Sequence, residues 1–419
     1  MEDSMLDRIR AARRDLDEVI EEIRRVDGYE QFLAAPTFDD VEEAAADQPL
    51  VYLAAADLGG LALVVRGDDV AHVPLPKLTE QSLHSMVDDF HQGYAAFRAD
   101  RPAQLAAWNS TLDRTTRWLW DEVMGPVLDE LRPAPAAVLV AGGLLGLLPL
   151  HAAWYEDSSA TTGRRYALDE LTLSYTPNAR SLTAARELAG GPADRLLAVV
   201  DPSASLPSVT AEARVAALAL PAGPTALTGP AATVEQVRDA LQHVDVAHFA
   251  CHGYANLLTP LESGINLAGG QALTLRDLLS LSLRLRLVVL SACETSTPGT
   301  ELPDEVVSLP TGMLQAGVGG IVASLWQVPD RPTLALMTEF YRRWRKDEPV
   351  PAAALRQAQQ WVRDTTNEQK LQAYDDARAA GSLPDDVADG LSEDLLLEEP
   401  EERSDAGLDA WAAFGFVGA

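Results

Sequence analysis

The sequence has few basic residues for its size. Its 33 lysines and arginines are outnumbered by 63 aspartates and glutamates, which gives a formal net charge of −30. A field of that sign repels phosphate backbones and anionic membrane surfaces, so we expect no direct binding of nucleic acid and no membrane attachment. The acidic excess would suit basic peptides or basic protein partners, although solubility alone would also account for it.

Cysteine and long hydrophobic runs are scarce as well. Cys251 and Cys293 are the only cysteines, so the sequence implies no disulfide framework and suits a reducing compartment. Residues 1–18 are charged throughout and lack the apolar core of a signal peptide. The longest apolar run, 136–150, is interrupted by glycines and is too short to span a bilayer. We therefore expect a cytoplasmic protein.

The composition is that of a globular protein, with 47% hydrophobic and 23% charged residues. Within an N-terminal helical segment, residues 1–48, apolar residues from Leu6 to Val26 recur at three- and four-residue steps and predict an amphipathic helix. The stretch 49–185 opens with a predicted hairpin, 50–55 and 61–66, and a third strand, 70–73. Helices are predicted over 79–131, with Trp108, Trp118 and Trp120 as core anchors. A buried strand, 136–141, and an exposed loop, 156–165, follow.

The stretch 186–419 alternates apolar strands with helices. This order predicts an α/β fold with a mostly parallel sheet and helices on both faces. The acidic stretch 384–405 is expected to be a solvated loop, and 411–417 to be an edge or closing strand. The predicted strands are 195–200, 244–250, 286–292 and 320–325, and the helices are 233–241, 274–281, 312–316 and 332–346.

Two of these strands run directly into reactive side chains. Cys251, His252 and Gly253 follow strand 244–250, and Cys293 with Glu294 follows strand 286–292. Ligands bind beyond the carboxyl ends of parallel strands, and a separation of 41 residues leaves room for about one crossover, so the two strands are expected to be neighbours or near neighbours.

His252 and Cys293 have the chemistry of a catalytic pair. A thiolate is a strong nucleophile, and an imidazole can accept and return its proton near neutral pH. The backbone amides of Gly253 and Cys293 would together stabilise an oxyanion. A single cysteine at a strand end is more often a buried apolar residue, and a single histidine a hydrogen-bonded one; only the combination favours catalysis.

Several segments resemble one known family. The segments HFACHG (248–253) and LVVLSACET (287–295) resemble the signature of the CHAT peptidases, caspase-like proteins often attached to tetratricopeptide arrays. The agreement extends in order over roughly 49–419. Further matching segments are GLLPLHAAW (146–154), LSYTPNARSL (173–182), the stretch 302–330 and AWAAFGFVG (410–418).

The resemblance implies a caspase-like fold and an endopeptidase of the caspase and separase clan, with His252 and Cys293 as the dyad and no cofactor. It also implies that 49–185 is a degenerate protease-like half packed on a catalytic domain, 186–419. Bacterial stress or defence proteolysis, switched on by a regulatory partner, is a further implication. The family's usual ending carries His or Pro before the tryptophan, where this chain has Leu408, Asp409 and Ala410. No repeat array precedes the domain, so the chain is either complete or a fragment of a longer protein.

Four residues are candidates for the substrate pocket. Glu294 would prefer a basic residue before the scissile bond, or is a loop residue bonded to backbone. Asp304 and Asp330 would border the cleft, or are ordinary surface acids. Trp326 would wall a peptide groove, or belongs to the core. The alternative for the whole protein is a non-catalytic interaction scaffold; a small-molecule binder is disfavoured because the sequence has no glycine-rich phosphate loop.

Three further residues have competing interpretations. His248, Cys251 and His252 invite a zinc site, but only residues two apart on a strand share a face and no fourth ligand is near, so no metal is expected. Cys251 is expected in the core. His151 is expected to be structural.

Overall fold

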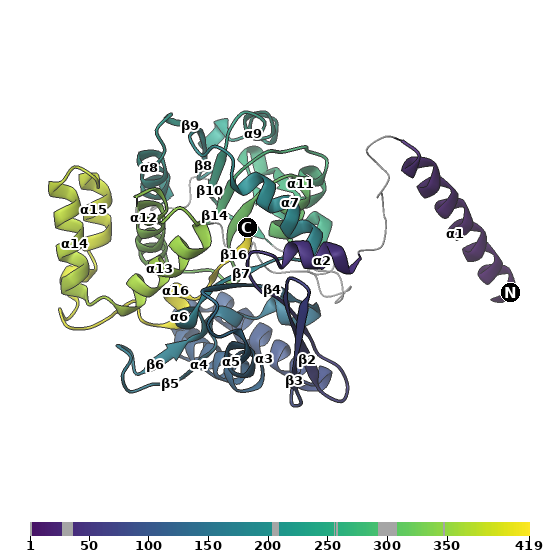
Figure 1. Ribbon diagram of the computed structural model, residues 1–419. Helices are drawn as coiled ribbons and strands as arrows, with labels where there is room; N and C mark the ends of the chain where they lie inside the picture. Colours follow the sequence, from purple (N-terminus) through teal and green to yellow (C-terminus); the bar gives the residue numbers. More distant parts are fainter. Residues whose placement is uncertain are drawn as a thin grey trace.

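An eleven-stranded sheet runs through the protein, in the order β3-β2-β1-β4-β7-β16-β15-β14-β10-β8-β9 (Figure 1). The computed structural model describes residues 2–26, 37–202, 209–254, 256, 259–291, 308–346 and 348–419. Seven of the ten neighbouring strand pairs are parallel. The predicted α/β class with a mostly parallel sheet is confirmed.

The first half of the sheet begins with an antiparallel hairpin and a third strand, as predicted. β1 pairs antiparallel with β2 and parallel with β4, and β7 joins β4 to β16 in the same direction. The strands are β1 (Leu50–Ala54), β2 (Gly60–Arg66), β3 (Asp69–Leu75), β4 (Ala136–Ala141), β7 (Thr172–Tyr175) and β16 (Phe414–Gly418). The strand β16 was expected at an edge of the sheet or as a closing strand. It lies in the middle of the sheet, between β7 and β15, so it is not an edge strand.

The strand direction reverses between β16 and β15, whose pairing is antiparallel. From there five strands run parallel to one another, and their carboxyl ends lie at the edge opposite to those of β4 and β7. They are β15 (Gly320–Ser324), β14 (Leu287–Leu290), β10 (Val246–Ala250), β8 (Leu196–Val200) and β9 (Pro224–Thr228). The sheet is continuous across the predicted domain boundary at residue 186, and the division into two halves stays a prediction.

Side chains that alternate along each strand point to the two faces of the sheet. One face packs against α3, α4, α5, α8, α12 and α13, and the other against α2, α7, α9, α10 and α11. The bounds are α2 (Phe38–Ala44), α3 (Glu80–Ala99), α4 (Arg101–Leu119), α5 (Gly125–Leu131), α7 (Ala179–Ala189), α8 (Val209–Ala219), α9 (Val234–Leu241), α10 (Leu275–Leu279), α11 (Leu309–Ala316), α12 (Asp330–Lys346) and α13 (Pro351–Asp364).

The helices predicted over 79–131 are α3, α4 and α5, with a π-helical turn at Trp120–Met124. Thr79 caps α3 because its hydroxyl accepts a hydrogen bond from the amide of Ser82. Trp108 is fully buried, as expected of a core anchor. Trp118 and Trp120 are half-buried and lie at the margin of the core.

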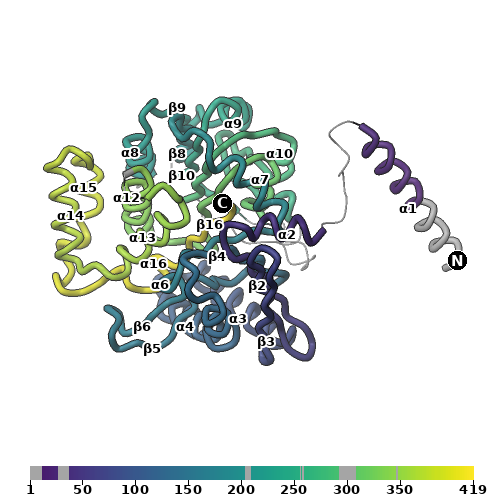
Figure 2. Tube along the Cα trace, in the orientation of Figure 1, coloured from purple at the N-terminus to yellow at the C-terminus, as the bar shows by residue number. Residues whose placement is uncertain are grey.

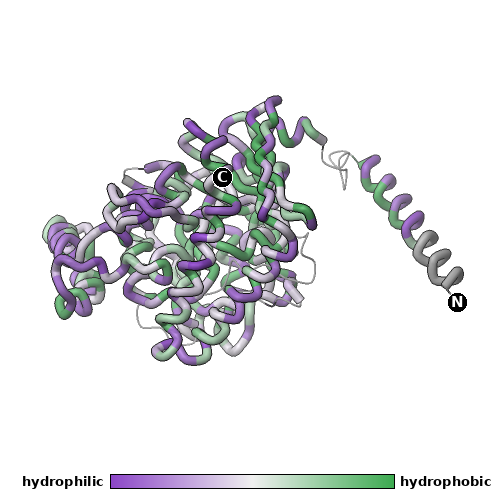
Figure 3. Tube along the Cα trace, turned by 90° about the horizontal axis from the view of Figure 1, so that it is seen from below, coloured by the Kyte–Doolittle hydropathy of each residue, from purple (hydrophilic) through white to green (hydrophobic). Residues whose placement is uncertain are grey.

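The predicted amphipathic N-terminal helix is α1 (Glu2–Arg24), which lies apart from the sheet (Figure 1). Along the coloured part of this helix, hydrophilic and hydrophobic residues alternate (Figure 3). Leu16 and Val19 on its apolar face are 56% and 51% exposed. Across the described part of the chain, no helix is both long enough and apolar enough to cross a membrane.

The expectation of a solvated loop over 384–405 holds for residues 398–404, which form no helix or strand and are mostly exposed, but is wrong for the part before them. Residues Asp385–Ser392 form α15, which packs beside α14 (Asn367–Ala379) on the outer side of α12 and α13 (Figures 1 and 2). Its acidic composition conceals an apolar stripe of Val387, Ala388 and Leu391, all fully buried. The stripe follows helical spacing, and burying it is what holds this acidic helix on the protein.

The expectation of an exposed loop over 156–165 holds only for its middle. Its ends form the antiparallel strands β5 (Trp154–Glu156) and β6 (Arg164–Tyr166). The guanidinium of Arg164 lies over the ring of Trp154, 3.8 Å from its centre, and pairs with Asp113. The remaining short elements are α6 (Ala167–Glu170), α16 (Leu408–Trp411), β11 (Gly253–Tyr254), β12 (Gly264–Asn266) and β13 (Ala272–Thr274).

Candidate active site

The strands that precede the two predicted catalytic residues are direct neighbours. β10 and β14 are parallel, with Val246 opposite Leu287 and Phe249 opposite Leu290. His252 follows the end of β10, and Ser291 follows the end of β14. Cys293, Glu294 and Asp304 lie outside the described residues.

The backbone around His252 and Gly253 is held by an antiparallel ladder. The carbonyl oxygen of His252 accepts a hydrogen bond of 2.8 Å from the amide of Asn266, and Gly253 lies opposite Ile265. Opposite pairs in such a ladder alternate between hydrogen-bonded and non-hydrogen-bonded. Because His252 and Asn266 are bonded, the N–H of Gly253 is directed away from β12. The imidazole of His252 is half-buried.

Asp330 begins α12 and interacts electrostatically with His252. Desolvation raises the pKa of Asp330 above its usual value, and the negative charge of Glu212 raises it further. The charges of Arg101 and His252 act in the opposite direction. Asp330 is exposed as a residue, so an acidic group lies at the accessible surface within electrostatic range of His252.

A buried polar cluster lies beneath this site. His248 in the middle of β10 is fully buried; its Nδ1 is 2.9 Å from the hydroxyl of Tyr341 in α12, and its Nε2 is 3.7 Å from Oε2 of Glu212 in α8. The Oγ of Ser291 is 3.5 Å from the same Nε2. Sequence reasoning considered His248 only as a metal ligand and missed Glu212 and Tyr341. The one available signal was a histidine within an otherwise apolar strand.

The other candidates are placed as follows. Cys251 is 2% exposed and packs among the apolar residues under α9, α10 and α11, as expected of a core residue. Trp326 is fully buried, donates from Nε1 to the carbonyl of Asp409 at 3.3 Å and meets Trp108 edge-on, so its role as a groove wall is wrong. Among the described residues, no group of three or more His, Cys, Asp or Glu side chains is arranged to hold a metal ion.

His151 is buried between Tyr175 and the backbone of Ala412. Its Nδ1 is 2.9 Å from the hydroxyl of Tyr175, and its Nε2 is 2.9 Å from the carbonyl oxygen of Ala412. Burial lowers the pKa of His151 to about 4, against the opposing effect of the bond to Ala412. A neutral, doubly bonded imidazole of this kind fits the structural role expected of it.

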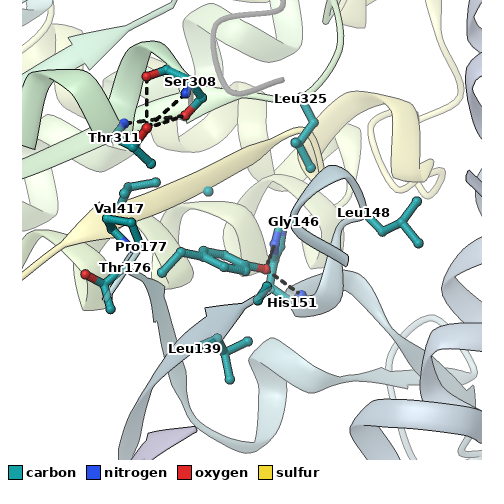
Figure 4. A pocket seen from close by; sticks show the side chains of 13 residues that line it. Leu139, Gly146, Leu148, His151, Thr176, Pro177, Ser308, Thr311, Leu325 and Val417 are labelled. Atoms are coloured by element: carbon teal, nitrogen blue, oxygen red, sulfur yellow. Dashed lines mark hydrogen bonds between the residues drawn. The ribbon is translucent and has the colours of Figure 1, made fainter. Parts of the chain in front are cut away.

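An apolar cavity adjoins His151 on the sheet (Figure 4). Neither His252 nor Asp330 is among its described lining residues. Its labelled lining includes Leu139, Leu148, Thr176, Leu325 and Val417, with Ser308 and Thr311 from the start of α11.

Comparison with protein families gives one match, in which the model described as CHAT domain covers residues 113–419. None of the curated protein sequences matches this chain.

Solved structures of similar fold include separase from Saccharomyces cerevisiae, in its complex with securin. Two such structures match with TM-scores of 0.57 and 0.58, at 9% and 10% identity, and each match covers 96% of this chain. The chain spans about a third of the separase chain, 33% and 32%. The Arg-specific cysteine proteinase gingipain R matches at a TM-score of 0.38 and 9% identity, over 74% of this chain and 67% of the gingipain chain. A TM-score that low does not establish a shared fold. The likeness to separase confirms the predicted caspase-like fold.

Proposed function

The chain belongs to the CHAT domain family, and from that premise we propose that it is a cysteine endopeptidase in which Cys293 is the nucleophile and His252 the general acid and base. A protein or peptide is the substrate, and the reaction needs no cofactor.

The register of β10 and β14 carries the proposal. Phe249 and Leu290, which lie opposite each other, are 41 positions apart, and so are the other pairs of this ladder. Cys293 also stands 41 positions after His252. The same offset beyond both strands supports a meeting of the thiol and the imidazole at the carboxyl edge of the sheet, where ligands bind in such folds.

The proposed reaction proceeds through an acyl-enzyme. His252 takes the proton of the Cys293 thiol, and the thiolate attacks the scissile carbonyl carbon. The amides of Gly253 and Cys293 donate to the oxyanion that forms, and the outward direction of the Gly253 N–H supports this role. The imidazolium then protonates the leaving amine as the C–N bond breaks. A water that has lost its proton to His252 hydrolyses the thioester and releases the thiol.

The proposed preference is for a basic residue before the scissile bond. Asp330 supports it, because this acid lies within electrostatic reach of His252 and at the surface. Glu294 and Asp304 would add acidic groups to the same pocket. A charged pocket of this kind would select arginine or lysine over neutral side chains.

The wider setting rests on the family for the regulatory partner and the stress or defence role, and on composition and charge for the rest. We propose that the peptidase works in the cytoplasm, without direct contact to nucleic acid or membrane, and that a regulatory protein partner switches it on in bacterial stress or defence. A division into a degenerate half, 49–185, and a catalytic domain, 186–419, belongs to the same proposal.

Cleavage of a peptide library tests the proposed activity. Wild-type protein should produce new amino termini that follow arginine or lysine, and Cys293→Ala should produce none. Cys251→Ala is the matched control, since it removes the buried cysteine and should retain cleavage. Equal cleavage by wild type and Cys293→Ala would assign the activity to a contaminant and leave this protein as an interaction scaffold.

A further inference from the structure

Glu212 is a buried acid on the inner side of α8. The residue is 3% exposed, and its Oε2 accepts no hydrogen bond within the described parts of the chain. The nearest ionisable nitrogen recorded for it is Nε2 of His248, at 3.7 Å. A buried polar oxygen without a hydrogen bond costs stability, whereas an apolar residue of similar size would pack there without that cost. Glu212 therefore calls for an explanation beyond stability.

The surroundings of His248 favour one arrangement of its hydrogen bonds. Burial raises the pKa of Tyr341 well above its usual value, with a smaller contribution from the charge of Glu212, so its hydroxyl keeps its proton. That hydroxyl can donate to Nδ1 of His248, at 2.9 Å. With that bond made, an N–H at Nε2 would face Glu212 and Ser291. His248 is thus fixed on one side by α12 and directed toward α8 and β14 on the other.

Ser291 connects this cluster to the ends of both strands. Its hydroxyl donates to the carbonyl oxygen of Phe249 at 3.3 Å, beyond the last described pair of the β10–β14 ladder. The next carbonyl of β10, that of Ala250, accepts a bond of 3.0 Å from the amide of Asp201 at the end of β8. Ser291 therefore links the cluster to the point where three strands end together.

We propose that Glu212 and His248 are positioning residues, which act through Ser291 to fix the carboxyl ends of β10 and β14 and so orient the residues that follow them. The expected effect on kcat rests on the proposed peptidase function. The expected effect on the order of the strand ends does not. The proposed role of Glu212, His248 and Ser291 is structural. Their effect is on the alignment of nucleophile and imidazole, where an error of about 1 Å can cost about 100-fold in rate.

Kinetics on Glu212→Gln and His248→Phe test the proposal. Glu212→Gln keeps the volume of the side chain and removes the charge, and His248→Phe keeps a planar aromatic ring and removes its nitrogens. We expect kcat to fall about 10- to 100-fold with KM within about twofold, because alignment is lost while substrate binding is kept. Tyr341→Phe should cause a smaller fall in kcat. It removes the hydrogen bond at Nδ1 of His248 and leaves Glu212 and Ser291 next to Nε2.

The matched control is a second buried tyrosine–histidine pair. Tyr175→Phe removes a hydroxyl that also lies 2.9 Å from the Nδ1 of a buried histidine, His151, but that pair has no bond to β10 or β14. It should leave kcat and KM unchanged. A fall in kcat equal to that of Tyr341→Phe would show that general destabilisation is the cause and would overturn the proposal.

Amide hydrogen exchange separates this proposal from the peptidase assignment. The amides of Asn266 and Asp201 are bonded to the carbonyls of His252 and Ala250. Glu212→Gln should speed exchange at both amides, relative to Tyr175→Phe. Faster exchange in a protein that cleaves no peptide would contradict the peptidase and support the positioning role. Unchanged exchange and unchanged kcat in a folded Glu212→Gln would overturn it. If that variant does not fold, Ser291→Ala, which removes one hydroxyl, takes its place. Its amide exchange and kcat are judged by the same criteria.

Discussion

The ammonium of Lys370 and the carboxylate of Asp405 form a buried ion pair, with Nζ 2.6 Å from Oδ2 and exposures of 0% and 2%. The pair joins α14 to the segment before the closing strand, and Arg331, next to Asp330, adds a second cation 3.0 Å from Oδ1 of Asp405. The acidic stretch is therefore fastened to the helix that begins at the candidate site.

Loss of one partner of this ion pair should be severely destabilising. Lys370→Met leaves the Asp405 carboxylate buried with Arg331 alone, and we expect the free energy of unfolding to fall by about 3 to 5 kcal/mol. Urea denaturation measures it. The control is Lys77→Met, because Lys77 is 75% exposed in its pair with Glu122 and should matter by less than about 1 kcal/mol. Equal losses of unfolding free energy in the two variants would mean that the buried Lys370–Asp405 pair stabilises the fold no more than an exposed pair does.

The stability of the fold should fall as the solution is acidified, in part because of His151. Its pKa is about 4 in the folded protein and 6.5 ordinarily. The unfolded chain therefore binds a proton that the folded protein refuses, and stability is lost as pH falls from the ordinary value toward the lowered one. Between about pH 7 and about pH 5 this amounts to about 2 kcal/mol.

Substitution of His151 isolates that contribution. His151→Gln should be less stable than wild type near neutral pH but should show a smaller further loss on acidification. Urea denaturation at the two pH values gives the comparison. The same acid dependence in both proteins would place the titrating group elsewhere.

The ionised carboxylate of Asp330 should lower the stability of the fold at neutral pH while it contributes to substrate selection. Its pKa is raised in the folded protein, so the folded state holds the proton more tightly than the unfolded chain does. The resulting advantage is present below the ordinary pKa and is lost as pH rises through the raised one, so the ionised group is a cost at neutral pH. Asp330→Asn should gain stability there, by less than about 1 kcal/mol because the residue is exposed.

The same substitution should weaken cleavage after basic residues. We expect kcat/KM for peptides with arginine before the scissile bond to fall about tenfold or more, with peptides carrying a neutral residue there much less affected. Asp39→Asn, at an exposed acid in α2, is the charge-matched control. A uniform fall across all peptides would argue that Asp330 acts on catalysis rather than on selection.

The strands and their chemistry could be predicted from the sequence because local composition determines them. The apolar stretches that became β10 and β14 are bounded by polar loops, and their ends carry His252 and Ser291 within recognisable segments. What local pattern could not provide was the position of each strand in the sheet. β16 was predicted as a strand, but its place between β7 and β15 depends on pairing with residues far away in the chain.

The buried cluster was missed for the same reason. Glu212, His248 and Tyr341 come from α8, β10 and α12, and no spacing in the sequence indicates that they meet. The first of these helices was itself not predicted, and its acid looks like any other in a chain with 63 of them. α15 shows the converse error, where abundant charge concealed three buried apolar residues.

Covalent labelling tests the central claim most directly. Wild-type protein is incubated with a peptidyl electrophile that carries arginine next to the reactive group, and intact mass with peptide mapping locates the adduct. The account predicts one adduct on Cys293, its loss in His252→Ala, and its retention in Cys251→Ala. A Cys293 that stays unlabelled in wild type under every condition, or is labelled as fast without His252 as with it, would contradict the account.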